Sequence, residues 1–392
     1  DVGRRRAADA RGLRAGERRM MRPRIAFVVN GGPGSAMDVR ARAFAERLSD
    51  TYDVRILHRG RWKVLSLAAL FLRLLALRPA AAWVLDVAYS GVLATWLASI
   101  LARFEWVIDT GDPIVELARS MGRGRVGLAL TSLLERIALG RASHVVVRGT
   151  FHEEWLRGRG WQNVTTIQDG VDAVAVAAGS GAGAREKTRA ELGLGGDLVL
   201  GVVGSLSWSE RLGIGYGWDL VETLGLLRDL PVKGLIVGDG PGAERLRRRA
   251  AELGVAERLV FTGRVPYERL PALLAAMDVA LSTQTDDLVG RFRTTGKLPL
   301  YLAAGRFILT SDVGEAKLVL PEASRVPYAG TVDRSYPGKL AERVRPLVAD
   351  RARLGEGAVG AAIAAERFDY SVLASRASGV LAAMTRIRGP FG

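Results

Sequence analysis

The chain has 392 residues, of which 48% are hydrophobic and 25% are charged, and its formal net charge is +15. This length and composition fit two globular domains with full cores and exclude a disordered chain. The chain has no cysteine, which excludes a disulfide framework and a thiolate zinc site, and its three histidines are too few for a histidine-rich metal cluster. We therefore expect no metal site. A chain without cysteine also fits the reducing cytoplasm.

The first 21 residues are rich in arginine and contain no apolar stretch like that of a signal peptide. Met20 and Met21 directly precede the first apolar strand, so we expect residues 1–21 to be a disordered basic segment outside the native product. Along the remaining chain, basic residues are not interleaved with aromatic ones, so we expect no nucleic acid partner. A basic surface would instead favour phosphorylated substrates or contact with an anionic membrane.

From residue 24 onward, apolar strands alternate with helical stretches, a pattern that indicates βαβ units and a parallel sheet. In the first half, the pattern predicts strands at 24–29, 54–57, 82–85, 106–108, 144–147 and 165–167. A glycine-rich loop over 31–35 leads into a helix for which Asp38 is the predicted N-cap.

The apolar stretch 62–77 is about 16 residues long, shorter than the ~20 residues that cross a bilayer. A helix of this kind either packs on the sheet or lies along a membrane surface.

The stretch 173–190 is rich in Ala and Gly and is the predicted linker between the two domains. After it the alternation resumes, with strands predicted at 198–203, 234–237, 259–262, 279–282 and 307–310. The expected fold is α/β, with two facing Rossmann-like domains over 22–172 and 191–365. Ligands of such sheets bind beyond the carboxyl ends of the strands.

Four turns place glycine at these strand ends, where backbone N–H groups can approach an anion closely. They are Gly31–Ser35, Gly204–Ser205, Gly238–Gly242 and Thr294–Gly296. One such turn is a weak signal, because short βα loops often need glycine for their geometry alone. Four turns on two facing sheets favour a phosphate-binding cleft.

The segment 291–297 carries three cations and two hydroxyl groups directly before a predicted helix. These residues are Arg291, Arg293, Thr294, Thr295 and Lys297. Such a segment could be a solvated loop in an arginine-rich protein. Because the cations converge on a helix start after an apolar strand, we favour the binding of a diphosphate.

The run Gly238–Ala243 also matches the dinucleotide fingerprint G-x-G-x-x-A. A dehydrogenase would place an acidic residue at the end of the next strand, where this chain has Gly263 and Arg264. An NADP-dependent oxidoreductase that uses Arg264 is therefore kept as an alternative. A nucleophile elbow, a P-loop and an Asp-x-Asp metal motif are all absent from the sequence.

Two long runs in the second half carry a family resemblance: LIVGDGPGAERLRRRAAELGVAERLVFTGRVPYERLPALLAAMDVALSTQ, over 235–284, and GKLPLYLAAGRFILTSDVGEA, over 296–316. Together with TTIQDGVD over 165–172 and AAERFDYSVLASRASGVL over 364–381, they resemble the family 4 retaining glycosyltransferases of GT-B fold. The resemblance covers almost all of 24–384. It implies that residues 366–392 form closing helices that cross back to the first domain.

The resemblance implies a nucleoside-diphosphate sugar as donor and no further cofactor. The apolar stretch 62–77 and the basic surface favour a lipid-linked or glycan acceptor. It places Gly32 and Gly34 near the donor phosphates or the acceptor, and Gly263 and Val265 beside the nucleobase. The amides of Thr294, Thr295 and Gly296 would face the diphosphate. The other residues that we expect to line the donor site are Gly204, Ser205, Arg211, Gly238, Asp239 and Arg291.

The chain departs from the family pattern at two glutamate positions, which are Phe292 and Leu300 here. At the family's diphosphate Arg it has Ser205. Arg211, Arg291 and Arg293 could supply the missing charge, and Asp286 or Asp287 could replace a lost hydroxyl contact.

The leading hypothesis is retaining glycosyl transfer, in which Arg211, Arg293 and Lys297 stabilise the leaving diphosphate. Asp112, in the loop that also holds Asp109, would orient or deprotonate the acceptor hydroxyl, or would simply cap a helix beside Pro113. A non-catalytic nucleotide- or glycan-binding module is the second hypothesis.

Overall fold

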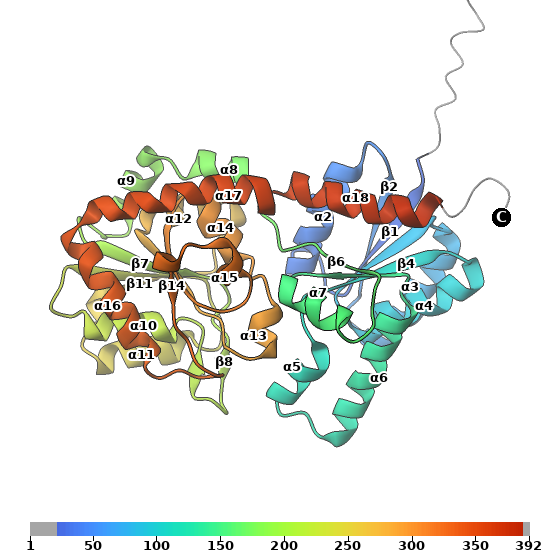
Figure 1. Cartoon of the computed structure of the whole chain (residues 1–392), viewed down its shortest axis with the longest axis horizontal. Coiled ribbons are helices and arrows are strands. Elements are labelled where there is room, and N and C mark those ends of the chain that lie inside the picture. The colour runs from blue at the N-terminus through green and yellow to red at the C-terminus, as the bar shows by residue number, and fades with distance from the viewer. Residues whose placement is uncertain (1–21, 387–392) are drawn as a thin grey trace, which may run out of the picture.

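The computed structural model describes residues 22–386, and the expectation for residues 1–21 lies outside them. Two six-stranded parallel sheets form the centres of two domains. The first has the order β2-β1-β3-β4-β5-β6 and the second β11-β10-β7-β12-β13-β14. Both sheets carry helices on both faces (Figure 1). Buried parallel strands read as continuous apolar runs, which is why the sequence predicted most of them closely.

The strands of the first sheet are β1 (Arg24–Val29), β2 (Asp53–His58), β3 (Ala81–Leu85), β4 (Glu105–Thr110), β5 (His144–Val147) and β6 (Val164–Thr166). Its helices are α2 (Ala36–Leu48), α3 (Lys63–Leu77), α4 (Tyr89–Ala102), α5 (Ile114–Ser120), α6 (Arg125–Arg141) and α7 (Thr150–Arg157). Ser35, not the predicted Asp38, is the N-cap of α2 and accepts a hydrogen bond from the Asp38 amide. Asp38 accepts one from the Gly34 amide instead, at 2.7 Å.

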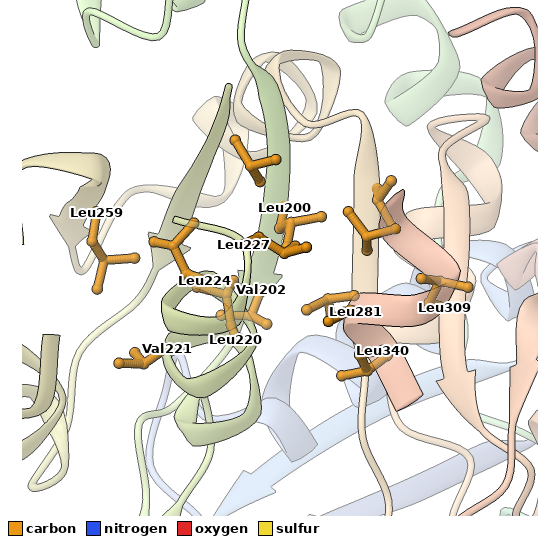
Figure 2. Close-up of a cluster of buried hydrophobic side chains, with 14 of the residues drawn as sticks. Leu200, Val202, Leu220, Val221, Leu224, Leu227, Leu259, Leu281, Leu309 and Leu340 are labelled. Atoms are coloured by element: carbon orange, nitrogen blue, oxygen red, sulfur yellow. The ribbon is translucent and has the colours of Figure 1, made fainter. Parts of the chain in front are cut away.

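The strands of the second sheet are β7 (Leu198–Val203), β10 (Val232–Val237), β11 (Leu259–Gly263), β12 (Val279–Ser282), β13 (Phe307–Ser311) and β14 (Arg325–Val326). A small hairpin, β8 (Trp208–Ser209) and β9 (Ile214–Gly215), follows β7. The helices after it are α10 (Trp218–Leu226), α11 (Ala243–Glu252), α12 (Leu270–Ala276), α13 (Leu288–Phe292), α14 (Lys297–Ala303), α15 (Glu315–Val319) and α16 (Tyr336–Ala349). Leucines from β7, α10 and α16 pack into one of the two apolar layers of this sheet (Figure 2).

The stretch 173–190 was predicted to be a linker. It instead contains the whole of α8 (Ala173–Gly179) and most of α9 (Ala182–Glu191). Both helices pack against α12 of the second domain. Arg189 of α9 is buried, and its guanidinium donates to the Ala276 carbonyl at 2.9 Å and to the Asp278 carboxylate at 3.2 Å. The composition rich in Ala and Gly therefore did not indicate these two helices, and the buried ion pair anchors the second of them, α9.

The chain crosses between the domains twice, at adjacent points. Val171 donates to the Phe368 carbonyl and Tyr370 donates to the Val171 carbonyl, both at 3.0 Å. Helix α17 (Gly360–Ile363) precedes the second crossing and α18 (Tyr370–Arg386) follows it. The buried side chains of α18 join the core of the first domain beside α2. Figure 1 shows α18 reaching over that domain. Within residues 22–386, no helix combines the length and apolarity needed to cross a bilayer.

Candidate functional site

The carboxyl ends of the two sheets meet at the domain interface. Thr150, at the start of α7 after β5, donates from its amide to the Glu315 carboxylate at 2.9 Å. Gln168, just after β6, donates to the same carboxylate at 2.9 Å. The Thr294 hydroxyl of the second domain donates to the Arg148 carbonyl of the first. Glu315 is 1% exposed, so a buried carboxylate of the second domain holds the strand ends of the first.

Asp112 and Arg293 form an ion pair across this interface. Asp112 follows β4, and Arg293 lies between α13 and α14. Burial would lower the pKa of Arg293, but the hydrogen bond and charge of Asp112 outweigh it and raise that pKa. Asp112 does not cap α5, whose N-cap is Pro113. Asp112, the candidate base, and Arg293, a candidate for binding the diphosphate, are thus paired with each other in this structure.

Lys297 lies against an aromatic ring and has no carboxylate within 4.0 Å among the described residues. Its Nζ is 3.5 Å from the centroid of the Tyr216 ring. A Cβ on Gly204 would come within 2.9 Å of the Lys297 side chain, so this glycine makes room for it. Burial, with the positive charge of Arg293 nearby, lowers the pKa of Lys297 to about 8. This cation is held in place without being neutralised, which suits an incoming anion.

The predicted glycines divide into two groups. Around Gly32, Gly34, Gly263 and Gly296, an added Cβ would meet nothing within 4 Å. A ligand can therefore approach the backbone at these positions closely, although the Gly34 amide already donates to Asp38.

The glycines of the fingerprint turn 238–242 instead pack against the protein's own backbone. An added Cβ on Gly238 would lie 2.0 Å from the Gly204 carbonyl oxygen, and one on Gly240 would lie 2.6 Å from that of Leu206. Asp239 is exposed, and its carboxylate accepts from the Gly240 amide at 2.8 Å. These glycines have a packing reason that requires no dinucleotide.

Three predicted donor ligands have other roles in this structure. Arg211 is exposed in the loop between β8 and β9, and the exposed Arg291 is paired with Asp286 at 2.7 Å. The Thr294 hydroxyl is occupied by Arg148, which leaves only its amide for a ligand. By contrast, the Thr295 hydroxyl oxygen is buried and has no hydrogen-bond partner among the described residues. It is the hydroxyl in this segment that can receive a ligand.

Four further predicted residues are Ser205, Val265, Asp286 and Asp287. Ser205 is exposed, and Val265 is half-buried against the second domain's core. Asp287 caps α13 by accepting from the Gly290 amide at 2.9 Å. Since Asp286 is bound to Arg291, neither carboxylate is free to replace a lost hydroxyl contact.

Phe292 occupies one of the two positions where the family carries glutamate, and it is an interface residue here. It is 3% exposed, and its ring stacks on His152 of α7 with a centroid distance of 4.6 Å and an interplanar angle of 8°. Trp155 meets the same ring edge-on. Burial lowers the pKa of His152 to about 4. Leu300, at the second glutamate position, packs on the core of the second domain.

A buried ion network beside Asp112 was not predicted from the sequence. Asp109 is fully buried and accepts from Arg40 at 2.8 Å and from Arg148 at 3.2 Å. Burial alone would raise its pKa, but these two guanidinium groups lower it. Asp169, where the family has Asn, lies 3.6 Å from Arg148. The network fixes the strand ends beside Asp112.

Asp86, directly after β3, is a second carboxylate that sequence reasoning missed. Its φ is 74°, a left-handed backbone that is uncommon outside glycine and often found at functional sites. Burial raises its pKa, with Arg148 and Asp112 nearby. The sequence contains no motif that indicates this carboxylate, because Asp86 is a single acidic residue at the end of one strand.

Residues 185–351 match the family model described as Glycosyl transferases group 1. The chain is 29% identical over 172 residues, 42% of its length, to 2-deoxystreptamine glucosyltransferase from Streptomyces kanamyceticus. It is 32% identical over 146 residues, 36% of its length, to a GDP-mannose-dependent α-(1-6)-phosphatidylinositol monomannoside mannosyltransferase from Mycobacterium tuberculosis. The matched parts span only 43% and 37% of these relatives.

Solved structures resemble nearly the whole chain. Anabaena HepE in complex with UDP and glucose aligns over 92% of this chain and 100% of its own, with a TM-score of 0.72 and 18% identity. Sucrose-phosphate synthase from Thermosynechococcus elongatus aligns over 94% of this chain and 100% of its own, with a TM-score of 0.73 and 17% identity. These structures confirm the predicted GT-B fold, and the family model agrees with the predicted resemblance over residues 185–351.

Proposed function

We propose that this chain, whose residues 185–351 belong to the group 1 glycosyltransferases, moves a sugar from a nucleoside-diphosphate sugar to an acceptor. We further propose retention of configuration and no requirement for a metal. The observation that carries the proposal is the set of groups around Lys297: an ammonium without a carboxylate partner, the open backbone of Gly296 and the buried Thr295 hydroxyl. All three suit a diphosphate.

In the proposed reaction, the donor diphosphate exchanges partners with the Asp112–Arg293 ion pair. Arg293 and Lys297 then stabilise the negative charge that develops on the leaving group. The bond between the anomeric carbon and the phosphate oxygen breaks, and its electron pair stays on the diphosphate. The acceptor hydroxyl oxygen forms the new bond to the anomeric carbon.

The acceptor's proton passes to a carboxylate or to the departing diphosphate. Asp112, once released by Arg293, is our first candidate to orient or receive it. Asp86 is the second candidate, since it lies directly after β3 near Asp112 and burial raises its pKa.

We propose a lipid-linked or glycan acceptor and a cytoplasmic site of action, in contact with the inner face of the membrane. The mycobacterial relative is named for a phosphatidylinositol mannoside acceptor and the streptomycete relative for 2-deoxystreptamine. The mycobacterial name supports a lipid-linked acceptor, whereas 2-deoxystreptamine is an aminocyclitol and belongs in an acceptor screen as a small, soluble alternative. HepE was solved in complex with UDP, and the mycobacterial relative is named as GDP-mannose-dependent. Both uridine and guanosine diphosphate sugars therefore belong in a donor screen.

A non-catalytic binding module is the second candidate function. Two observations favour it: Phe292 fills the interface where the family has glutamate, and Asp112 already neutralises Arg293. An NADP-dependent oxidoreductase has less support, because the glycines of the fingerprint turn are packed against backbone.

The test is release of nucleoside diphosphate from UDP- and GDP-sugars, with and without extracted lipid or glycan acceptors. Lys297→Met should abolish turnover, whereas Lys187→Met, an exposed lysine on α9, should not change it. NMR of the product's anomeric proton reports retention, and added EDTA tests the need for metal. Donor binding without turnover by any of these sugars would favour the binding module.

A further inference from the structure

The outer surface of three helices in the first domain is apolar. Helices α3, α4 and α6 cover one face of the first sheet, the face opposite α2 and α18 (Figure 1). Val64 on α3 is 76% exposed, Leu101 on α4 is 66% exposed and Val126 on α6 is 76% exposed. We call this surface the three-helix patch, and its members are Trp62, Val64, Leu65, Leu72, Leu97, Ile100, Leu101, Val126, Leu130 and Leu133.

The three helices that carry the patch are neighbours. Helix α3 packs along α4, and α4 contacts α6. The guanidinium of Arg141, at the end of α6, lies 5.9 Å over the Trp96 ring of α4. Large exposed apolar surfaces on soluble domains mark interaction sites, so we expect a binding partner for this surface.

The charges around the patch are almost all positive. Helices α3 and α4 contain no Asp or Glu, and the only acid of α6, Glu135, is half-buried. Glu135 turns away toward α5, where it accepts from the Val115 amide at 3.4 Å. The exposed arginines on these helices or directly beside them include Arg61, Arg73, Arg78, Arg103, Arg123, Arg125, Arg136 and Arg141.

We infer that the three-helix patch docks on an anionic lipid bilayer. Apolar side chains of this kind enter the boundary between headgroups and acyl chains, while arginines reach the phosphates. A second copy of the chain fits less well, because a two-fold contact would set the same arginines against one another. The inference rests on the membrane contact proposed above and assigns it a surface. It does not depend on the proposed sugar transfer, since docking requires neither donor nor acceptor.

The experiment is flotation of the full chain with vesicles of phosphatidylcholine alone or of phosphatidylcholine with phosphatidylglycerol. The protein should float with the anionic vesicles and do so less as salt is raised. Leu65→Glu and Leu101→Glu should each weaken binding at least about tenfold. Val174→Glu is the matched control, because Val174 is 78% exposed on α8 of the second domain and should have no effect.

Arg73→Gln should weaken binding about fivefold and keeps the test valid if a glutamate variant fails to fold. Failure of the wild-type chain to float with anionic vesicles at low salt would overturn the inference. An equal loss in Val174→Glu would also overturn it. So would a dimer, seen by analytical ultracentrifugation, that Leu65→Glu separates, because the patch would then be a contact between copies.

Discussion

Arg293 of the second domain donates a hydrogen bond from its Nε to the carboxylate of Asp112 in the first, although 181 residues separate them in the sequence. Each group neutralises the other until a ligand intervenes. A diphosphate can compete for Arg293 because guanidinium groups bind phosphate oxygens in the same forked manner as carboxylates. Donor binding would therefore free Asp112, which predicts that the donor binds before the acceptor.

Asp112→Ala should lower kcat about 100-fold or more without weakening donor binding. The carboxylate is lost from the acceptor side, while Arg293 is released from its competitor. Steady-state kinetics gives kcat, and calorimetric titration with the nucleoside diphosphate gives the affinity. Unchanged turnover would remove Asp112 from the reaction and leave Asp86 as the candidate carboxylate.

Nucleotide affinity should fall as pH rises above about 8, because Lys297 loses its proton there. Well above this pKa, each further pH unit should weaken binding about tenfold, until the bound-state pKa sets a new limit. Lys297→Arg, which remains charged, should remove this pH dependence. Tyr216→Ala should weaken binding as well, since the ring that holds the ammonium is gone. An identical pH profile in Lys297→Arg would exclude Lys297 as its source.

Phe292→Glu, which restores the family's residue, should destabilise the protein and not improve activity. The new carboxylate would replace a buried ring stacked on His152, and loss of a buried Phe costs about 3–5 kcal/mol. Urea unfolding measures the change. Leu226→Glu, at an exposed position on α10, is the control and should have little effect. A stable Phe292→Glu variant with faster turnover would show that Phe292 is not required at the interface.

His152 should make the folded state less stable as the pH falls below 6.5, the pKa of this histidine in the unfolded chain. Its folded-state pKa is lowered to about 4, so the unfolded chain takes up the proton first. This contribution is fully present above pH 6.5, declines as pH falls toward 4, and amounts to about 3 kcal/mol at most. The measurement is urea unfolding across that range for wild type and His152→Phe. Parallel stability curves would contradict the prediction.

The strands were the most predictable part of this fold, because a buried parallel strand such as β7 is apolar at nearly every position. The helices α8 and α9 were missed because their residues, read alone, have the composition of a linker. The ion pair between Arg189 and Asp278 that anchors α9 joins distant parts of the chain.

The site was predictable where it depends on local sequence, and otherwise not. The segment 291–297 was found from its clustered charges, and Lys297 does lie unpaired by a carboxylate among the described residues. Three contacts depend on how distant strand ends meet. They are the pairing of Arg293 with Asp112, the stacking of Phe292 on His152 and the contact of Lys297 with the Tyr216 ring. The turn 238–242 matches the dinucleotide fingerprint, but its glycines are explained by close packing on the backbone of Gly204 and Leu206.

The most direct measurement is thermal unfolding of residues 22–392 in the presence of UDP, GDP, ADP, TDP or NADP. A ligand at ~100 times its Kd adds about 2.7 kcal/mol of stability, which raises the melting temperature measurably. We predict a shift with one nucleoside diphosphate that disappears in Lys297→Met and persists in Lys187→Met. A shift with NADP alone, or no shift with any of these nucleotides, would contradict the proposed donor site.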